Sequence, residues 1–392
     1  MMKNILFVTL LLSSSLFAMN LDELINKALE KNPSLQSIQH RISANKSSID
    51  ISNQFSNPTI SYTQNTISDD QAMSQQTVSL QQKLPYFGKR DSLKAVAEAQ
   101  GKVLDENLEQ SRVNLVNEIK NQAYTIWELE EQYKIIKDYE DLTKQNIELF
   151  ESYTSTSGNQ HMGIMSAELT LSDLKIQKST LNSLIYSAYA RVSYLSAFEV
   201  KDLEIDLVVL DIQDIQELID DLNNNHSLAI KDKEILKSKA MIKNAELNNY
   251  PDVNLLGAYS YRKNFDNYAT FGVGVTLPIY STEDYKEQEA RALALSSQSL
   301  KEDKKIEITS EFKSAYIQMK SAYEIYHIVH DEAIPQIDHM FELTSSSIAT
   351  GGDLFKYIDI LVQKLKLEQK SISAVASYNK AQAKISALAG EL

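Results

Sequence analysis

The chain has 392 residues, no cysteine and a formal net charge of −14. The absence of cysteine excludes disulfides, thiolate metal sites and a lipid-modified N-terminal cysteine. A surface of this charge repels nucleic acid, so we expect no nucleic-acid partner.

Residues 1–18 have the pattern of a secretory signal peptide. Lys3 supplies the positive start, residues 5–12 are apolar, and small residues lead to a cleavage site after Ala18. The apolar run is too short for a membrane helix, and no other stretch approaches the roughly 20 apolar residues that such a helix requires. We therefore expect an exported protein without a spanning helix: periplasmic, secreted, or a β-barrel of an outer membrane.

Two regions, 58–85 and 251–278, have the period-two alternation of β-strands, and each begins and ends at a proline. Apolar residues on one side of such strands, with small or polar residues on the other, are typical of the wall of a transmembrane β-barrel. A soluble sandwich with one buried face is the alternative interpretation. In the second region the residues predicted to face lipid are Val253, Leu255, Phe271, Val273 and Val275.

Long helices are predicted outside these regions. No proline lies between Pro85 and Pro251, and proline is the strongest breaker of a helix interior. A helix over residues 91–154 would be roughly 95 Å long. Its apolar positions alternate spacings of four and three, the seam of helices packed as coiled coils, and this spacing recurs near the C-terminus. The first seam consists of Leu115, Ile119, Gln122, Ile126, Leu129, Tyr133 and Ile136, and the second of Ile358, Leu361, Leu365, Ile372 and Val375.

The chain also repeats itself at a constant offset. Asn32 and Leu35 return as Asn225 and Leu228, 193 residues later (225 − 32 = 193). The same offset relates the prolines that bracket the strand regions, and it relates residues 194–197 to residues 387–390. The predicted domains are a signal peptide (1–18), a first repeat (19–200, hairpin at about 58–85) and a second repeat (201–392, hairpin at about 251–278).

Four strands cannot close a barrel around a usable lumen, and open strand edges cannot face lipid. The chain is therefore expected to oligomerise. Its fold class is predicted to be mainly α with β-hairpins, in a twofold internal repeat whose long coiled-coil helices build the walls of a tube.

This arrangement resembles the TolC family of outer-membrane efflux proteins over the whole mature chain. The order of helix, hairpin and long helix pair, given twice, is that of the family. The segment that ends with Leu84-Pro85-Tyr86-Phe87-Gly88-Lys89-Arg90 is similar to a passage frequent in the heavy-metal branch, the CusC- and CzcC-like proteins. The resemblance implies a homotrimer in which an α-helical barrel continues a transmembrane β-barrel of twelve strands, four from each chain.

The resemblance further implies a passive export duct from the periplasm to the exterior, without enzymatic activity, in the outer membrane of a Gram-negative bacterium. Heavy-metal cations are the expected cargo; drug or organic-compound efflux and type I protein secretion are the alternatives. The implied partners are a periplasmic adaptor (membrane fusion) protein, an inner-membrane pump of the RND type and outer-membrane lipid. From another class, a periplasmic coiled-coil adaptor or scaffold is the rival, although adaptors lack the duplicated hairpins.

Site residues follow from the same resemblance. Asp359 corresponds to a position at the periplasmic tip of the family's tube, and Lys356 lies where many members have a second Asp. We expect these two residues to form the channel gate. Gly158, Gly351 and Gly352 fall at turns between paired helices, where positive φ is commonly required; they are expected to contact the adaptor.

No catalytic or cofactor motif stands out. The chain has no P-loop, no dinucleotide-binding turn and no HExxH or nucleophile-elbow sequence, so neither enzyme activity nor a cofactor is expected. His327 and His330 have the spacing of a shared helix face, but Pro335 interrupts the helix and no carboxylate completes a ligand set. Met162 and Met165 are close in sequence, without further thioethers nearby. We therefore predict no metal site.

Overall fold

The computed structural model describes residues 19–65, 74–153, 158–348 and 352–392. The predicted signal peptide and Gly351 lie outside these ranges. The chain divides into two compact units. Unit 1 comprises residues 1–32, 115–212 and 316–384, and unit 2 comprises residues 33–114, 213–315 and 385–392.

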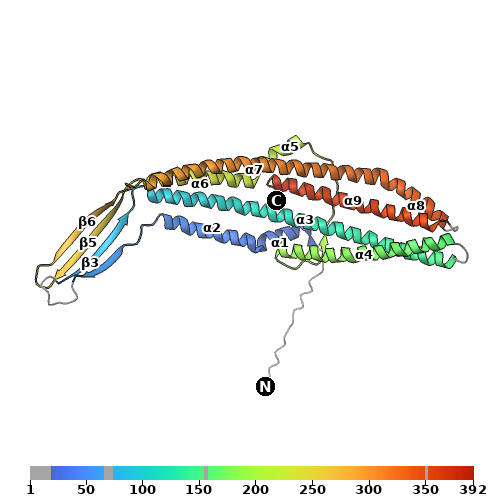
Figure 1. Cartoon of the computed structure of the whole chain (residues 1–392), viewed down its shortest axis with the longest axis horizontal. Coiled ribbons are helices and arrows are strands. Elements are labelled where there is room, and N and C mark those ends of the chain that lie inside the picture. The colour runs from blue at the N-terminus through green and yellow to red at the C-terminus, as the bar shows by residue number, and fades with distance from the viewer. Residues whose placement is uncertain (1–18, 66–73, 154–157, 349–351) are drawn as a thin grey trace, which may run out of the picture. The chain divides into compact units, whose positions relative to one another are not determined.

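Unit 1 is built of helices that run alongside one another (Figure 1). Its buried apolar cluster joins α3, α4, α8 and α9 and includes Ile136, Phe150 and Leu361. Three residues of the predicted seam, Ile119, Ile126 and Ile136, have no exposed surface. The elements are β1 (Met19–Asn20), α1 (Leu21–Lys31), the second part of α3 (Lys89–Tyr153), α4 (Gly158–Ser196), β4 (Leu203–Glu204), the end of α7 (Thr282–His327), a π-helix (Ile328–Ala333), α8 (Ile334–Ile348) and most of α9 (Leu354–Leu388).

Unit 2 combines helices with one antiparallel sheet of four strands, in the order β2-β3-β5-β6. The helix predicted over 91–154 is α3, a helix of 65 residues whose first part lies in this unit. None of the described helices carries an apolar stretch long enough to cross a bilayer. The elements are α2 (Pro33–Ser52), β2 (Thr59–Gln64), β3 (Gln75–Leu84), α5 (Ile215–Asp220), a 3-10 turn (Asp221–Asn224), α6 (His226–Asn248), β5 (Asp252–Arg262), β6 (Tyr268–Thr276) and the first part of α7.

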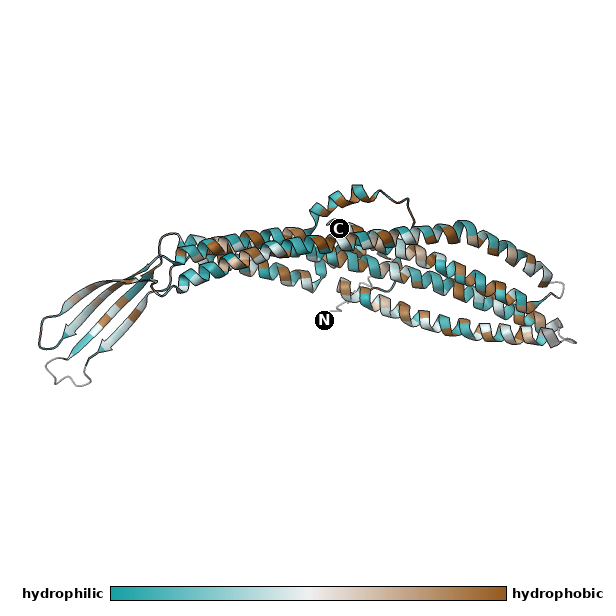
Figure 2. Ribbon diagram, turned by 45° about the horizontal axis from the view of Figure 1, so that its top comes forward, coloured by the Kyte–Doolittle hydropathy of each residue, from teal (hydrophilic) through white to brown (hydrophobic). Residues whose placement is uncertain are grey.

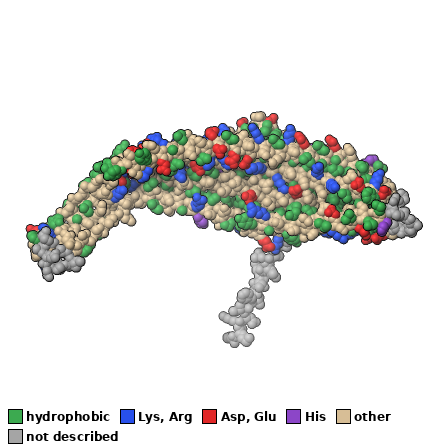
Figure 3. All heavy atoms as spheres, in the orientation of Figure 1, with side chains coloured by type: hydrophobic (Ala, Val, Ile, Leu, Met, Phe, Trp, Pro, Cys, Tyr) green, Lys and Arg blue, Asp and Glu red, His purple; other side chains and the backbone are tan. Residues whose placement is uncertain are grey.

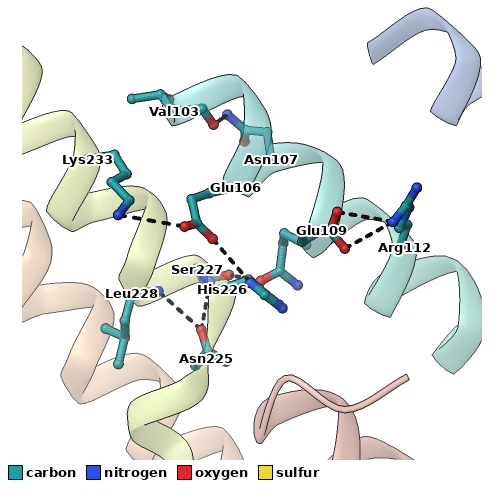
Figure 4. Close-up of polar contacts among 11 residues, drawn as sticks. Val103, Glu106, Asn107, Glu109, Arg112, Asn225, His226, Ser227, Leu228 and Lys233 are labelled. Atoms are coloured by element: carbon teal, nitrogen blue, oxygen red, sulfur yellow. Dashed lines mark hydrogen bonds and ion pairs between the residues drawn. The ribbon is translucent and has the colours of Figure 1, made fainter. Parts of the chain in front are cut away.

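Asparagine side chains begin two of the helices. The Asn20 side chain accepts a hydrogen bond from the Glu23 backbone N–H (2.7 Å) and caps α1. Asn225 caps α6 in the same way, accepting from Ser227 and Leu228 (Figure 4). Such caps satisfy backbone donors that have no partner within the first helical turn.

The Asn225 side-chain amide also makes a second hydrogen bond, and Asn32, 193 residues earlier, makes the equivalent one. Asn32 Nδ2 donates to the Leu195 carbonyl (2.7 Å), and Asn225 Nδ2 donates to the Leu388 carbonyl (2.8 Å). In both places a buried asparagine satisfies a carbonyl near the end of a long helix.

Backbone conformation recurs at the same offset. Of the described residues, four have positive φ: Gly88 (87°) and Ala197 (60°), then Ser281 (55°) and Gly390 (81°). Each of the last two lies 193 positions after one of the first two. We infer from these contacts and angles that the two halves of the chain are structural repeats. The compact units do not coincide with the repeats, because α3 and α7 each contribute to both units.

Replacing Asn225 by Ala is expected to destabilise the protein by about 1–3 kcal/mol, because the Leu388 carbonyl and the first donors of α6 lose their partner. Asn223→Ala is the matched control, since its exposed side chain reaches only the Asp220 carbonyl. Thermal unfolding of the purified proteins in detergent is the measurement. Equal midpoints for both variants would contradict this role of Asn225.

Candidate functional site

The four-stranded sheet has two chemically different faces. In the register, Val253 lies opposite Val275, Leu255 opposite Val273, and Gly257 opposite Phe271. Residues directly opposite each other in an antiparallel pair point to the same side of a sheet. The five residues predicted to face lipid therefore share one face.

That face continues apolar across the other two strands. Val78 and Leu80 of β3 lie opposite Tyr62 and Ile60 of β2, in the same rows. Phe271 is 89% exposed and Val273 is 71% exposed, although contact with water is unfavourable for apolar side chains. Figure 2 shows the apolar positions as bands on the strands. A continuous exposed apolar face of this kind is expected to lie against lipid or another protein surface and not against water.

The opposite face is polar and hydrogen-bonded. Gln75 Nε2 donates to the side chains of Thr77 (3.0 Å), Ser260 (3.0 Å) and Tyr268 (2.9 Å), which come from β3, β5 and β6. Small residues accompany them, including Gly272 and Gly274. Charged side chains are few on the strands in the face drawn in Figure 3, whereas they cover the helices. The sheet thus has one apolar and one polar face, the pattern typical of a transmembrane barrel wall.

The predicted family motif lies where the sheet meets α3. Lys89 Nζ donates to Asp252 Oδ1 (2.7 Å) and to the Tyr250 carbonyl (2.7 Å), with its side chain 11% exposed. Arg90 donates to the Asn53 carbonyl (2.8 Å). Gly88 has the positive φ of the turn that opens the helix. The motif residues therefore join strand, turn and helix within the chain, which is a structural role.

Asp359 and Lys356 lie on an exposed side of the first turns of α9. Asp353 caps this helix, because its side chain accepts from the Phe355 N–H (3.0 Å). Asp359 Oδ2 accepts from Gln363 Nε2 (2.8 Å). Among the described residues the two candidate gate residues form no ion pair with each other, so both charges face outward from this chain.

The predicted turn glycines behave differently from one another. Gly158 begins α4, and Gly352 precedes α9. Gly352 is not among the described residues with positive φ, so that part of the prediction is wrong for Gly352, and for Gly158 it stays a prediction. Gly352 is small for another reason: a Cβ there would lie 2.8 Å from the backbone oxygen of Ser347, to which its own N–H donates.

A buried contact fixes the side of α9 that carries Asp359. Tyr357 is 3% exposed, and its hydroxyl accepts a hydrogen bond from Asn146 Nδ2 of α3 (3.2 Å). The Phe341 ring of α8 packs against Tyr357, with ring centroids 5.4 Å apart. Because Tyr357 is held on the core side, Asp359 and Lys356 are kept on the outer side.

Two carboxyl groups of unit 1, the buried Glu140 and the half-buried Glu368, have shifted pKa values. Lys144 and Lys178 donate to Glu140, and these hydrogen bonds lower the pKa of the Glu140 carboxyl. Burial raises the pKa of the Glu368 carboxyl, against the opposing contacts of Tyr139 and Lys364. Both groups join neighbouring helices of unit 1.

The described residues contain no cluster of histidine and acidic side chains that could hold a metal ion. His327 Nδ1 lies 2.7 Å from Asp331 Oδ2, while the His330 ring stacks on Tyr326. His327 ends α7 and His330 lies in the π-helix that follows, and the two imidazole rings contact different residues. Met162 and Met165 are exposed.

Sequence reasoning missed a polar row on α9. Its apolar seam was recognised, but the same spacing of three and four also relates nine polar positions on the other side of the helix. Those nearest the C-terminus line a groove of about 670 Å³ together with Asn121 of α3 and Gln318 and Ser321 of α7. We call these nine the α9 row: Lys356, Asp359, Gln363, Lys366, Lys370, Ser373, Ser377, Lys380 and Lys384.

Residues 24–155 match a family described as outer membrane efflux protein. No curated protein matches the sequence. Among solved structures, CusC has a TM-score of 0.79 at 11% identity, covering 95% of this chain and 92% of its own. The open state of the Neisseria gonorrhoeae MtrE outer membrane channel gives 0.81 at 15% identity, covering 95% and 89%. The Campylobacter jejuni CmeC outer membrane channel gives 0.78 at 12% identity, covering 94% and 85%. These likenesses show a shared fold.

Arginine at Val273 is expected to cost about 2–4 kcal/mol of stability if the position lies near the bilayer midplane, because a guanidinium would replace an apolar side chain on the lipid face. Gly274→Arg is the matched control in the next position. A Cβ at Gly274 would lie 3.6 Å from the Asn254 Cβ, an ordinary contact, and the side chain would project to the polar face. Denaturant unfolding from lipid vesicles compares them; equal loss at both positions would contradict the assignment of the faces.

Proposed function

We propose that this chain, which belongs to the TolC family of outer membrane efflux proteins, is the outer-membrane channel of a tripartite efflux system. It is a transport duct and not an enzyme. In the proposal the channel crosses the outer membrane and extends into the periplasm, and energy comes from a partner.

The sheet is the observation that carries the proposal. One face is apolar and exposed, the other is polar, and the order β2-β3-β5-β6 leaves β2 and β6 as its edges. Unpaired backbone groups cannot face hydrocarbon, so the edges need partners. Three copies would supply twelve strands (3 × 4) and would close the sheet when β2 of each copy pairs with β6 of the next.

The helices provide the rest of the duct. Long helices with buried coiled-coil seams are suited to the wall of a tube, in which each helix packs on two neighbours. A periplasmic adaptor and an inner-membrane pump of the RND type are the proposed partners. The turns that contain Gly158, Gly351 and Gly352 are the proposed contacts with the adaptor.

Asp359 and Lys356 are the proposed gate. Threefold symmetry would collect three carboxylates and three ammonium groups near one axis, where limited water strengthens their interaction. Salt bridges between copies would hold the constriction closed. Support comes from their exposure on α9, beside a core contact that keeps the helix in one orientation.

Heavy-metal cations stay the cargo predicted from the motif at Gly88-Lys89-Arg90. The contacts of these residues are internal to the chain, so they support the turn between sheet and helix and give no contact to a cargo. The CusC likeness, at 11% identity, concerns the fold. Drug or organic-compound efflux and protein secretion remain the alternatives.

Engineered disulfides test the closed trimer. The chain contains no cysteine, so each introduced pair is the only one present. We expect Ser61→Cys on β2, combined in separate variants with Thr270→Cys, Gly272→Cys or Gly274→Cys on β6, to give a covalent trimer on oxidation in outer membranes for at least one register. All four positions lie on the polar face.

Ser79→Cys in place of Ser61→Cys is the matched control, because Ser79 lies opposite Ser61 on the inner strand β3. It should give no covalent trimer. Monomers at every register, together with absence from the outer-membrane fraction, would refute the proposed channel and favour a soluble periplasmic scaffold.

Opposite changes at the gate should have opposite effects on ion preference. Asp359→Ala leaves the Lys356 ammonium groups of three copies to repel one another, which should open the constriction and shift its preference toward anions. Lys356→Ala leaves an acidic ring, which should favour cations. Conductance and reversal potential in planar bilayers measure both, and unchanged values in both variants would remove these residues from the gate.

A further inference from the structure

We propose that the α9 row makes the duct selective for anionic solutes, through lysines that repeat along the helix and are multiplied by three in the assembly. The inference rests on the proposed channel function and concerns its cargo. It starts from the charge of one helix: α9 contains six lysines and two acidic residues, a net charge of +4 (6 − 2), in a chain of net charge −14.

The α9 row occupies the side of the helix that faces away from the core. Tyr357, Leu361 and Leu365 are buried in the apolar cluster of unit 1. A residue two positions from a buried one lies about 200° around the helix, so Asp359 and Gln363 point away from that cluster. A row of nine polar residues at spacings of three and four is too long for a cap or a turn.

The opposite side of α9 near its C-terminal end is occupied. Asn379 Nδ2 donates to the Val208 carbonyl (3.1 Å), and the Tyr378 hydroxyl donates to the Leu210 carbonyl (2.9 Å). The segment that carries these carbonyls therefore lies on the far side from Ser377 and Lys384. Ser373 and Lys380 of the row bond to Glu128 of α3, so the part of the α9 row left for solvent is the part that carries Lys366 and Lys370.

Two lysines in the middle of the row carry unbalanced charge. Lys366 and Lys370 are exposed, and neither forms an ion pair within the described part of the chain. Lys380 is different, since its Nζ lies 2.8 Å from Glu128 Oε2 of α3. Around Lys370 the groove is lined by the uncharged Asn121, Gln318 and Ser321. Glu128 of α3 accepts from Ser373 and Lys380, and Lys366 and Lys370 are left without a paired acid in the described part of the chain.

The equivalent helix in the first repeat carries less of this charge. At the 193-residue offset, Lys366 corresponds to Asp173, Lys370 to Gln177 and Lys380 to Ser187 of α4, whereas Lys384 corresponds to Arg191. Lys366 and Lys370 thus have no basic counterpart on α4. The lysines are therefore a property of α9, and a trimer would present them with threefold multiplicity.

Rings of lysine are the arrangement by which pores favour anions, because they raise the local concentration of counter-ions and exclude cations. The chemical class of cargo is a small organic or inorganic anion carrying carboxylate, phosphate or sulfate. This competes directly with the heavy-metal cation predicted from the motif, and one set of measurements separates them.

The test uses the full-length protein in planar bilayers under a potassium chloride gradient. The reversal potential of the wild-type channel should show preference for chloride. Lys366→Glu combined with Lys370→Glu should lower the chloride-to-potassium permeability ratio by about tenfold or more. Pyrophosphate added on the periplasmic side should block the wild-type current and should not block the double variant. Zinc ions should block the double variant and should not block the wild-type channel.

Lys137→Glu combined with Lys175→Glu is the matched control, with the same change of charge on exposed lysines of α3 and α4. Lys175 lies two residues from Gln177, so it points to the other side of α4. This variant should keep the wild-type selectivity. Outer-membrane trimer yield accompanies every variant, so that a folding defect is seen separately.

Each result decides a different point. A conducting wild-type channel that prefers potassium, or a double variant with unchanged selectivity, overturns the anion inference and leaves the channel function intact. Loss of the trimer in the double variant, with the control variant still trimeric, would mean that an acidic segment of another copy covers the α9 row, which also overturns it. Absence of any conductance refutes the proposed function itself.

Discussion

The unpaired backbone edges of β2 and β6 are the constraint on which the rest of the structure depends. A sheet with one apolar and one polar face separates lipid from water only when no edge is left open. In the proposed channel, closure is supplied by other copies of the chain. The continuous helices α3 and α7 each contribute residues to both compact units.

A single periodicity gives a helix such as α9 both a buried apolar side and an exposed polar side. On α9 the spacing of three and four places Leu361 and Leu365 in the core and places Lys366 and Lys370 outside it. Since 3.6 residues complete a turn, a buried seam and an exposed row can run the length of one helix without mixing. Packing and the chemistry of the exposed surface are therefore separable, and the second can change between repeats while the first is kept.

Cargo is a question about exposed charge and not about fold. Channels at 11–15% identity share this fold at TM-scores of 0.79 and 0.81, so the likeness carries no information on what passes through. The motif at Gly88-Lys89-Arg90 binds the chain to itself through Asp252 and Asn53. The uncompensated lysines of α9 are a direct physical feature of the surface, and they favour anions.

Local periodicity made most of the architecture predictable. The strand alternation, the long α3 and its seam were readable from the chain because each depends on neighbours a few residues apart. Tertiary structure alone decided that β3 pairs with β5, that Lys89 meets Asp252, and that Gly352 is small because Ser347 approaches it. These contacts join residues distant in sequence or depend on how a turn closes, so no spacing encodes them. The surface of α9 left open likewise became visible only once its core side was known.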